Sequence, residues 1–250
     1  MRGRVYLVGA GPGAPDLLTL RAAEILRRAD VVFHDALVHP ATLALAARAE
    51  KVAVGKRSGR RSTAQKFINK RLVDSARSHA VVVRLKGGDP MLFGRAQEEI
   101  DALRRAGVEF EVVPGVTAAS AAAAELGVSL TRRGLSRHVV FVTPRTADGG
   151  RANEWASAVL AADTAVLYMG AGLAESISAE LIGRGMRADT PVALVEGASL
   201  PGRRALVGTL AELPALASKT GDGPTTVLFG EVLKDGAAIP AEIGALLKQA

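Results

Sequence analysis

The sequence predicts an α/β protein of two domains, and three observations lead to this fold class. Short Val-rich runs alternate with helix-length segments, glycine loops follow three of these runs, and the pattern changes after a polar loop at residues 131–134. The 250 residues are 48% hydrophobic but only 4% aromatic, so Ala, Val and Leu must supply most of the core.

The first half contains five strand patterns with helical segments between them, which predicts a mainly parallel sheet. The expected strands are Val5–Ala10, Asp30–Phe33, Lys51–Val54, Val81–Leu85 and Glu109–Val113. One face of a helix is predicted by apolar residues at spacings of four and three: Leu18, Ala22, Ile25 and Ala29. Ser62 and Gln65 form a capping-box pattern that predicts a helix to about Ala76.

The second half contains five more strand patterns: Val139–Thr143, Thr164–Met169, Val192–Glu196, Ala205–Gly208 and Thr225–Gly230. Helices are expected at Leu173–Ile182 and Pro240–Lys248. Because no long helical segment lies near the last two strands, we expect some antiparallel pairing and therefore a mixed sheet. A domain boundary is expected near residues 132–137, which gives domains of residues 1–134 and 135–250.

The formal net charge is +7, and its distribution favours an anionic small molecule over nucleic acid as the partner. Basic pairs gather in short loops, where solvated loop charge is the alternative explanation: Lys56-Arg57, Arg60-Arg61, Arg132-Arg133 and Arg203-Arg204. Nucleic-acid-binding surfaces usually interleave aromatic residues with basic ones, and these loops do not. The absence of cysteine excludes disulfides, thiolate metal sites and cysteine nucleophiles.

The sequence offers no membrane or export signal. The first apolar run, Val5–Ala10, is too short for a signal-peptide core, and no stretch reaches the roughly 18 apolar residues of a membrane helix. A cytoplasmic protein without a membrane partner is therefore expected.

The first glycine loop permits three interpretations. Gly9-Ala10-Gly11-Pro12-Gly13-Ala14 follows a predicted strand and formally matches the dinucleotide-binding fingerprint, with Asp35 where a ribose-binding acid belongs. Pro12 and Pro15, however, lack the N–H donors that a pyrophosphate requires at such a loop. A NAD- or FAD-dependent oxidoreductase, a purely structural turn and a different ligand site all remain open.

Two further glycine loops follow predicted strands. Gly87-Gly88-Asp89 follows Val81–Leu85, and Pro114-Gly115-Val116-Thr117 follows Glu109–Val113. Ligands of open α/β sheets bind outside the carboxyl ends of the strands, so the three loops are expected to converge on one crevice. Asp89 could accept hydrogen bonds there from ligand hydroxyls or an ammonium group.

The order of these motifs resembles the tetrapyrrole (corrin/porphyrin) methyltransferase family. The resemblance extends from Val5 to about Leu233 and rests on residues 8–13, 16–20, 29–32, 84–90, 93–95, 98–99, 113–118, 167–170, 191–196 and 230–232. Lys86-Gly87-Gly88-Asp89-Pro90 with Phe93-Gly94-Arg95 is similar to the uroporphyrinogen-III C-methyltransferase branch.

This resemblance implies two α/β domains with S-adenosylmethionine in the cleft between them, and a homodimer. It implies C-methylation of uroporphyrinogen III to precorrin-2, through precorrin-1, for sirohaem or cobalamin synthesis, with S-adenosylhomocysteine as product. The implied cofactor residues are Pro12, Gly87, Gly88, Asp89, Leu92, Thr117, Ala118, Met169, Ala193 and Ala198. Pro12 would line the substrate side, and Met169, which periodicity alone places in the core, would help to hold the adenine with the region of Ala193 and Ala198 through backbone contacts.

The same resemblance implies the catalytic residues. Asp35 matches the family's candidate base, and Lys56 matches its proposed acid partner; a helix cap and plain surface charge are the respective alternatives. No metal is needed, because the sulfonium donor is already activated and the protein mainly aligns two reactants. Uroporphyrinogen III carries eight carboxylates, which arginine binds well. The candidate substrate-binding residues are therefore Arg57, Arg60, Arg61, Arg95, Arg132 and Arg133, and the loop of residues 55–62 is expected to move over bound substrate.

Several residues depart from the family pattern at the presumed substrate mouth: Ala14, Ser129, Arg132, Arg145 and Arg203. Two further alternatives therefore stay open. The chain could be another precorrin methyltransferase, or a catalytically decayed protein that binds the cofactor without turning it over.

Overall fold

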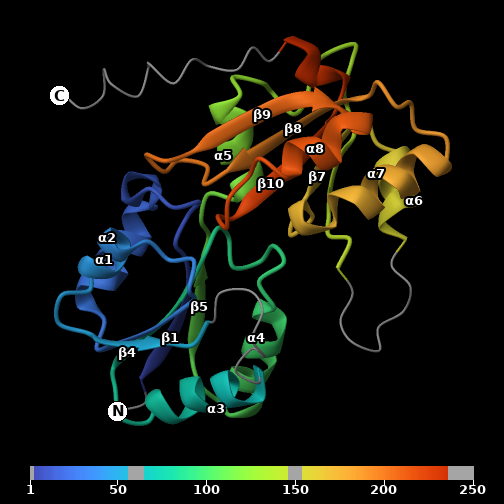
Figure 1. Ribbon diagram of the computed structural model, residues 1–250. Helices are drawn as coiled ribbons and strands as arrows, with labels where there is room; N and C mark the ends of the chain where they lie inside the picture. The colour runs from blue at the N-terminus through green and yellow to red at the C-terminus, as the bar shows by residue number, and fades with distance from the viewer. Residues whose placement is uncertain (1–2, 56–64, 146–153, 236–250) are drawn as a thin grey trace. The chain divides into compact units, whose positions relative to one another are not determined.

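The computed structural model describes residues 3–55, 65–145 and 154–235, which fold into two compact units, Met1–Ala118 and Ala119–Ala250 (Figure 1). Unit 1 contains the five strands β1 (Arg4–Gly9), β2 (Val31–His34), β3 (Glu50–Ala53), β4 (Val81–Lys86) and β5 (Phe110–Val113). They form one sheet in the order β3-β2-β4-β1-β5, and all four neighbouring pairs are parallel. The five predicted strands are thus confirmed to within one residue at each end.

Helices cover both faces of this sheet (Figure 1). On one face, α1 (Leu20–Arg28) and α2 (Pro40–Ala44) pack on the strands through a cluster that includes Ala22, Ile25 and Leu85. On the other face, α3 (Gln65–Ser75) and α4 (Ala96–Arg105) pack through Ile68, Leu72 and Ile100, among others. A short 3₁₀ helix, η1 (Pro15–Leu17), precedes α1.

The two predicted helices of unit 1 are confirmed within the described residues. The α1 helix begins after Thr19, whose hydroxyl oxygen accepts a hydrogen bond from the Ala22 backbone N–H at 3.1 Å. Of the predicted apolar face, Ala22 and Ile25 are buried in α1 and Ala29 is buried at its C-cap, whereas Leu18 precedes the helix and is only partly buried. The α3 helix is described from Gln65, and the predicted cap Ser62 lies outside the described residues.

Unit 2 contains a mixed sheet. Its strands are β6 (Val139–Val142), β7 (Thr164–Leu167), β8 (Pro191–Glu196), β9 (Arg204–Thr209) and β10 (Thr225–Gly230), in the order β6-β7-β10-β8-β9. Only β6 and β7 run parallel, which confirms the expected antiparallel pairing of the last strands. The β7 strand ends at Leu167 rather than at Met169, because Met169 adopts a left-handed backbone with φ of 59°.

Helices also lie on both faces of this second sheet. One face carries α6 (Trp155–Leu160), α7 (Ala174–Gly183) and α8 (Leu213–Ala217). The 3₁₀ helices η2 (Ala171–Leu173) and η3 (Leu210–Glu212) directly precede α7 and α8. The other face carries α5 (Ala118–Glu125) and the 3₁₀ helix η4 (Glu231–Asp235). The predicted helix at Leu173–Ile182 is confirmed, whereas the one at Pro240–Lys248 lies outside the described residues.

The division between the units falls after Ala118, earlier in the chain than the boundary expected near residues 132–137. The reason is the packing of α5, whose Ala119 and Ala122 lie in one buried cluster with Val166 and Leu228. The polar loop at residues 131–136 is part of unit 2, where the Ser136 and Thr164 hydroxyls hydrogen-bond at 2.8 Å. In the described part of the chain, no helix combines the length and apolarity needed to cross a membrane.

Candidate functional site

The loops after β1 and β4 are joined through their backbones. The Gly11 N–H donates to the Gly88 carbonyl oxygen at 3.2 Å, and the Gly88 N–H donates to the Gly11 carbonyl oxygen at 2.7 Å. Because the two parent strands are neighbours in the sheet, this isolated bridge extends their contact beyond the strand ends.

The loop after β5 packs against the other two at backbone distance. A Cβ atom added to Gly115 would lie 2.4 Å from the Gly88 carbonyl oxygen and 2.9 Å from the Gly9 Cα atom. A Cβ atom added to Gly9 would lie 2.7 Å from the Gly115 Cα atom. Only glycine fits at such approaches. The predicted convergence of the three glycine loops at the carboxyl ends of β1, β4 and β5 is therefore confirmed.

Backbone contacts of the first glycine loop also argue against dinucleotide binding there. The Ala10 N–H donates to the Lys86 carbonyl oxygen at 2.7 Å, the Gly11 N–H is bonded to Gly88, and Pro12 has no N–H. The α1 helix begins only at Leu20, well after the glycines, so its N-terminus does not close this loop. A pyrophosphate needs free loop donors and a helix start together; here the Ala10 and Gly11 donors are occupied and the helix starts elsewhere.

Asp89 ties the second loop to the third. Its carboxylate accepts hydrogen bonds from the Met91 N–H at 2.8 Å and from the Gly115 N–H at 2.9 Å. Each oxygen retains a lone pair after these bonds. Beside it, Gly88 has φ of +66°, and a Cβ atom added there would meet no heavy atom within 4 Å. The Gly87-Gly88-Asp89 segment thus presents open backbone next to a fixed carboxylate, an arrangement that suits an ammonium-bearing ligand.

The turn that follows, Phe93-Gly94-Arg95, has an unusual backbone. Phe93 and Arg95 both have left-handed φ values, 52° and 55°. Such values cost non-glycine residues about 1–2 kcal/mol each and concentrate at functional sites. The half-exposed Arg95 guanidinium donates to the Glu98 carboxylate from Nε at 2.7 Å and from Nη2 at 2.9 Å, and this hydrogen bonding raises the pKa of Arg95. The predicted substrate-binding arginine is therefore already paired with Glu98.

Asp35 lies just past the carboxyl end of β2, the strand next to β4. It does not cap the following helix: the N-cap of α2 is His39, whose Nδ1 accepts a hydrogen bond from the Ala41 N–H. Gly55 packs directly on the Asp35 backbone, because a Cβ atom there would lie 2.5 Å from the Ala36 nitrogen. The Asp35 carboxylate, 30% exposed, accepts a hydrogen bond from Arg84 Nη2.

Arg84 belongs to a buried ionic cluster that the sequence analysis missed. Its Nε donates to Glu99 Oε1 at 2.9 Å, and Lys86 Nζ donates to Glu99 Oε2 at 3.0 Å. The side chains of Arg84, Lys86 and Glu99 are at most 4% exposed. Burial, followed by the neighbouring Arg84 cation, lowers the pKa of Lys86. Although burial opposes its charge, the carboxylates of Asp35 and Glu99 raise the pKa of Arg84.

A sequence signal for this cluster was present. Buried parallel strands are usually continuous apolar runs, yet the central strand β4 reads Val-Val-Val-Arg-Leu-Lys. Two cations on the same face of such a strand require buried partners, and an acid on the helix above that face is where to look for one.

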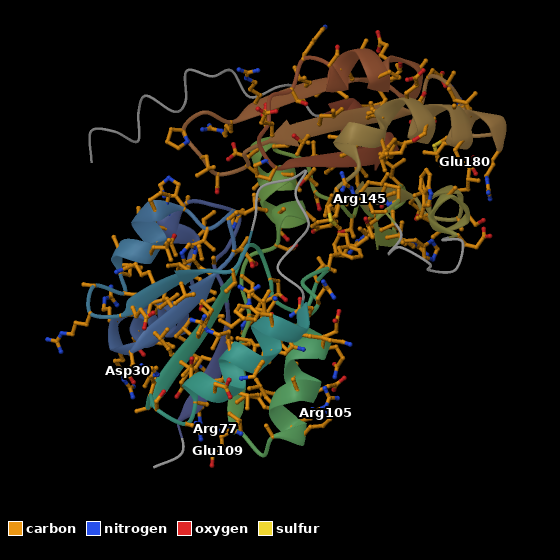
Figure 2. The ribbon with its side chains drawn as sticks, turned by 60° about the horizontal axis from the view of Figure 1, so that its bottom comes forward. Asp30, Arg77, Arg105, Glu109, Arg145 and Glu180 are labelled. Carbon is orange, nitrogen blue, oxygen red and sulfur yellow. The ribbon has the colours of Figure 1, made fainter. Side chains whose placement is uncertain are left out.

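Periodicity alone places Met169 of unit 2 in the core, but the structure shows that it is not a core residue. It is 47% exposed, and its left-handed backbone directs the carbonyl oxygen to Arg145 Nε at 3.2 Å. Figure 2 labels Arg145 in unit 2. Ala198 is buried just after β8, whose carboxyl end lies at the same sheet edge as that of β7. Ala193 is fully buried inside β8, between β9 and β10.

Three further groups of predicted residues remain. Leu92, Thr117 and Ala118 follow the second and third glycine loops and are partly buried. Arg132 and Arg133 are exposed in the 131–136 loop of unit 2, where Arg132 lines a hollow of about 120 Å³ with Gly127, Val128, Ser129 and Val232. Lys56, Arg57, Arg60 and Arg61 lie outside the described residues, as does most of the loop expected to move over substrate.

A larger hollow, about 460 Å³, is remote from the glycine loops. It lies between α3 and α4 and is lined by residues that include Asp74, Arg77 and Arg105. Arg77 precedes β4, and Figure 2 places it with Asp30 and Glu109, which precede β2 and β5, at the end of unit 1 where the strands begin. Ligands of open parallel sheets bind at the opposite end, so the volume of this hollow does not mark the site.

The chain is similar to known proteins in both sequence and fold. Residues 4–214 match the family described as Tetrapyrrole (Corrin/Porphyrin) Methylases. A siroheme synthase of Zymomonas mobilis subsp. mobilis is 47% identical over 232 residues, which are 92% of this chain but 49% of that protein. The chain therefore spans about half the length of the siroheme synthases it matches.

Solved structures match over nearly their full length. The uroporphyrin-III C-methyltransferase of Thermus thermophilus, solved with S-adenosyl homocysteine, superposes with a TM-score of 0.81 at 43% identity and covers 93% of this chain and 99% of its own. A cobalt precorrin-4 methyltransferase superposes with a TM-score of 0.80 at 29% identity, covering 92% and 96%. The parallel and mixed sheets, the packed glycine loops and these matches agree with one another. The chain belongs to the tetrapyrrole (corrin/porphyrin) methylase family of methyltransferases.

Proposed function

We propose that this chain uses S-adenosylmethionine to methylate uroporphyrinogen III at carbon, giving precorrin-2 through precorrin-1 for sirohaem- or cobalamin-type synthesis. The observation that carries the proposal is the edge of unit 1 where three glycine loops lock together and Asp35 follows the adjacent strand. The Thermus thermophilus enzyme, similar over nearly the whole chain, is named for methylation of uroporphyrin III and was solved with S-adenosyl homocysteine.

The cofactor residues are proposed from both units. Gly87, Gly88 and Asp89 bind the methionine portion, with Leu92, Thr117 and Ala118 beside them. The Gly88 face is open, and the Asp89 carboxylate retains lone pairs that an ammonium group could use. In unit 2, we assign adenine binding to backbone groups of Met169 and of the region of Ala193 and Ala198. Pro12 lines the substrate side.

The donor supplies a methyl group on a positively charged sulfur, already activated for in-line displacement. The protein aligns the reactants, excludes water and removes the proton that the pyrrole loses. We assign proton removal to Asp35, whose carboxylate is partly exposed and held by Arg84. Lys56 is the proposed acid partner. General acid–base groups typically contribute about a hundred- to ten-thousandfold in rate.

The remaining parts of the proposal concern the substrate and the setting. The carboxylates of the tetrapyrrole are assigned to Arg57, Arg60, Arg61, Arg95, Arg132 and Arg133, since arginine pairs bidentately with carboxylates. Arg95 would have to exchange its Glu98 partner for the substrate. We further propose a homodimer that works in the cytoplasm and binds neither nucleic acid nor membrane.

The experiment compares two aspartates at opposite ends of one strand. Asp30 precedes β2 and accepts a hydrogen bond from the Val81 N–H, whereas Asp35 follows β2 (Figure 2 labels Asp30). In anaerobic assays with uroporphyrinogen III, Asp35→Asn should lower kcat at least about a hundredfold while S-adenosylhomocysteine still binds. Asp30→Asn should retain the wild-type rate. Equal rates in all three proteins would refute the assignment of Asp35.

The two alternatives have separate outcomes in the same preparation. Binding of S-adenosylhomocysteine without methylation of uroporphyrinogen III, but with methylation of a precorrin, would make the chain a later methylase of the pathway. Binding without turnover of any tetrapyrrole would identify a decayed, cofactor-binding protein.

A further inference from the structure

Four charged side chains form a continuous chain inside unit 1, from Asp35 through Arg84 and Glu99 to Lys86. We propose that Arg84 is a positioning residue for methyl transfer: it holds the Asp35 carboxylate in place, and Glu99 and Lys86 hold Arg84. This inference rests on the proposed role of Asp35 as the base.

Every nitrogen of the Arg84 guanidinium is engaged. Nε donates to Glu99, Nη2 donates to Asp35, and Nη1 lies 3.2 Å from the Leu85 and 3.4 Å from the Phe33 carbonyl oxygen. The guanidinium is planar, so fixing two of its edges fixes the direction of the third. Glu99 and the two carbonyls therefore determine where Arg84 Nη2 points, and that point is Asp35 Oδ1.

Glu99 is itself held rigidly. Its Oε1 accepts from Arg84 and also from Gln65 Nε2 at 3.2 Å, while Oε2 accepts from Lys86. Gln65 lies on α3 and Glu99 on α4, so two helices and the central strand position this one carboxylate. The carboxylate is fully buried, which leaves no water to compete with these bonds.

The charges give Asp35 a defined place in the cluster. Among the described residues, Arg84 and Lys86 face one fully buried carboxylate, Glu99, so these three side chains together carry one uncompensated positive charge. An unpaired buried charge is strongly unfavourable. The Asp35 carboxylate, which accepts a hydrogen bond from Arg84 Nη2, supplies the balancing negative charge at the end of the cluster.

The other end of the chain reaches the proposed cofactor loop. Lys86 directly precedes Gly87, and a Cβ atom added to Gly94 would lie 3.1 Å from Lys86 Cε. The Lys86 side chain thus packs beneath the Phe93-Gly94-Arg95 turn. One buried cluster therefore links the proposed base to the segments proposed to bind donor and substrate. A displacement of about 1 Å at such a site can cost about a hundredfold in rate.

The test is a double-mutant cycle on the full chain, with Arg84→Met, Arg84→Lys, Asp35→Asn and both doubles. Arg84→Met should lower kcat about a hundredfold, with the KM for S-adenosylmethionine within about twofold of wild type. Arg84→Lys keeps the positive charge but not the planar guanidinium, so its kcat should be about tenfold higher than that of Arg84→Met and still below that of wild type. In the Asp35→Asn background, neither substitution should slow the reaction further, because the group that Arg84 positions is already lost.

A matched control is Arg4→Met. Arg4 opens the neighbouring strand β1 and pairs with Glu109 at 2.8 Å at the other end of the same sheet. This exposed pair should be dispensable, with kcat unchanged. Binding of S-adenosylhomocysteine, measured by calorimetry, reports whether each variant is folded.

The outcomes separate this inference from the function on which it rests. No methylation by the wild-type protein would refute the proposed function. With an active wild type, losses from Arg84→Met and Asp35→Asn that multiply in the double variant would overturn the positioning role. If Arg84→Met does not fold, Arg84→Lys takes its place in the cycle. Losses of kcat from Arg84→Lys and Asp35→Asn that multiply in the double variant would then overturn the positioning role.

Discussion

Gly11 and Gly88 hydrogen-bond to each other in both directions, so the loops after β1 and β4 form a single backbone unit. With Gly115 packed against Gly88, the three strands β4, β1 and β5 end in one rigid edge. This packing explains why these positions are glycine, and the Ala10 and Gly11 N–H groups are no longer available to a pyrophosphate.

The loop packing predicts a specific cost for a methyl group at residue 115. Gly115→Ala should destabilise the protein by about 1–3 kcal/mol, because the new Cβ atom would lie 2.4 Å from the Gly88 carbonyl oxygen. Urea denaturation measures this change in the free energy of unfolding. Gly183→Ala is the control: nothing lies within 4 Å of its Cβ position, so stability should stay the same or rise by up to about 1 kcal/mol. Equal effects of the two substitutions would contradict the packing argument.

The hydrogen-bonded N–H groups of the first glycine loop predict which ligands the protein binds. Since the Ala10 and Gly11 N–H groups are bonded within the protein, NAD and FAD should show no binding by calorimetry, while S-adenosylhomocysteine should bind. Competition of either dinucleotide with S-adenosylhomocysteine would contradict this account of the loop.

Because Met169 is a proposed adenine residue, its contact with Arg145 predicts a role for Arg145 in cofactor binding. Arg145→Ala removes the hydrogen bond to the Met169 carbonyl oxygen, worth about 0.5–1.5 kcal/mol, so S-adenosylhomocysteine should bind about two- to tenfold more weakly. Arg187→Ala breaks an exposed pair with Asp189 in the same unit and should leave the dissociation constant unchanged. If Arg145→Ala leaves the dissociation constant of S-adenosylhomocysteine unchanged, the Arg145–Met169 contact has no role in cofactor binding.

Asp163 predicts a pH dependence of stability in unit 2. The N–H groups of Arg137 and His138 donate to its carboxylate at 2.7 and 3.0 Å and lower the pKa of Asp163 below its ordinary value near 3.8. A depressed carboxyl pKa contributes stability that is present above pH 3.8 and disappears as the pH falls through the folded-state pKa. Wild type should therefore exceed Asp163→Asn in stability at pH 6, and the difference should shrink toward pH 2. A stability difference between wild type and Asp163→Asn that does not change with pH would refute this prediction.

The strands were predictable because short Val-rich runs bounded by turn residues leave little choice between strand and helix. The convergence of the glycine loops followed as well, since the ends of adjacent parallel strands must meet. The role of Asp35 came from a resemblance, whereas its pairing with Arg84 of β4 was missed. Two cations in the apolar run of β4 do indicate a buried ionic cluster, but residue spacing alone does not identify the acids that they meet.

Two other features escaped the sequence for physical reasons. The helix α5 is built almost entirely of Ala, which has no strong preference for one neighbour over another, so nothing local indicated that it packs with unit 2. Met169 has the apolar side chain of a core residue, and its left-handed backbone became evident only in the structure.

The most direct test of the account is the mass of the tetrapyrrole after anaerobic incubation of uroporphyrinogen III with the protein and S-adenosylmethionine carrying a trideuterated methyl group. We predict a product that has gained two labelled methyl groups, with a singly methylated species appearing earlier in the time course. An unlabelled tetrapyrrole, in a preparation that binds S-adenosylhomocysteine, would contradict the proposed function.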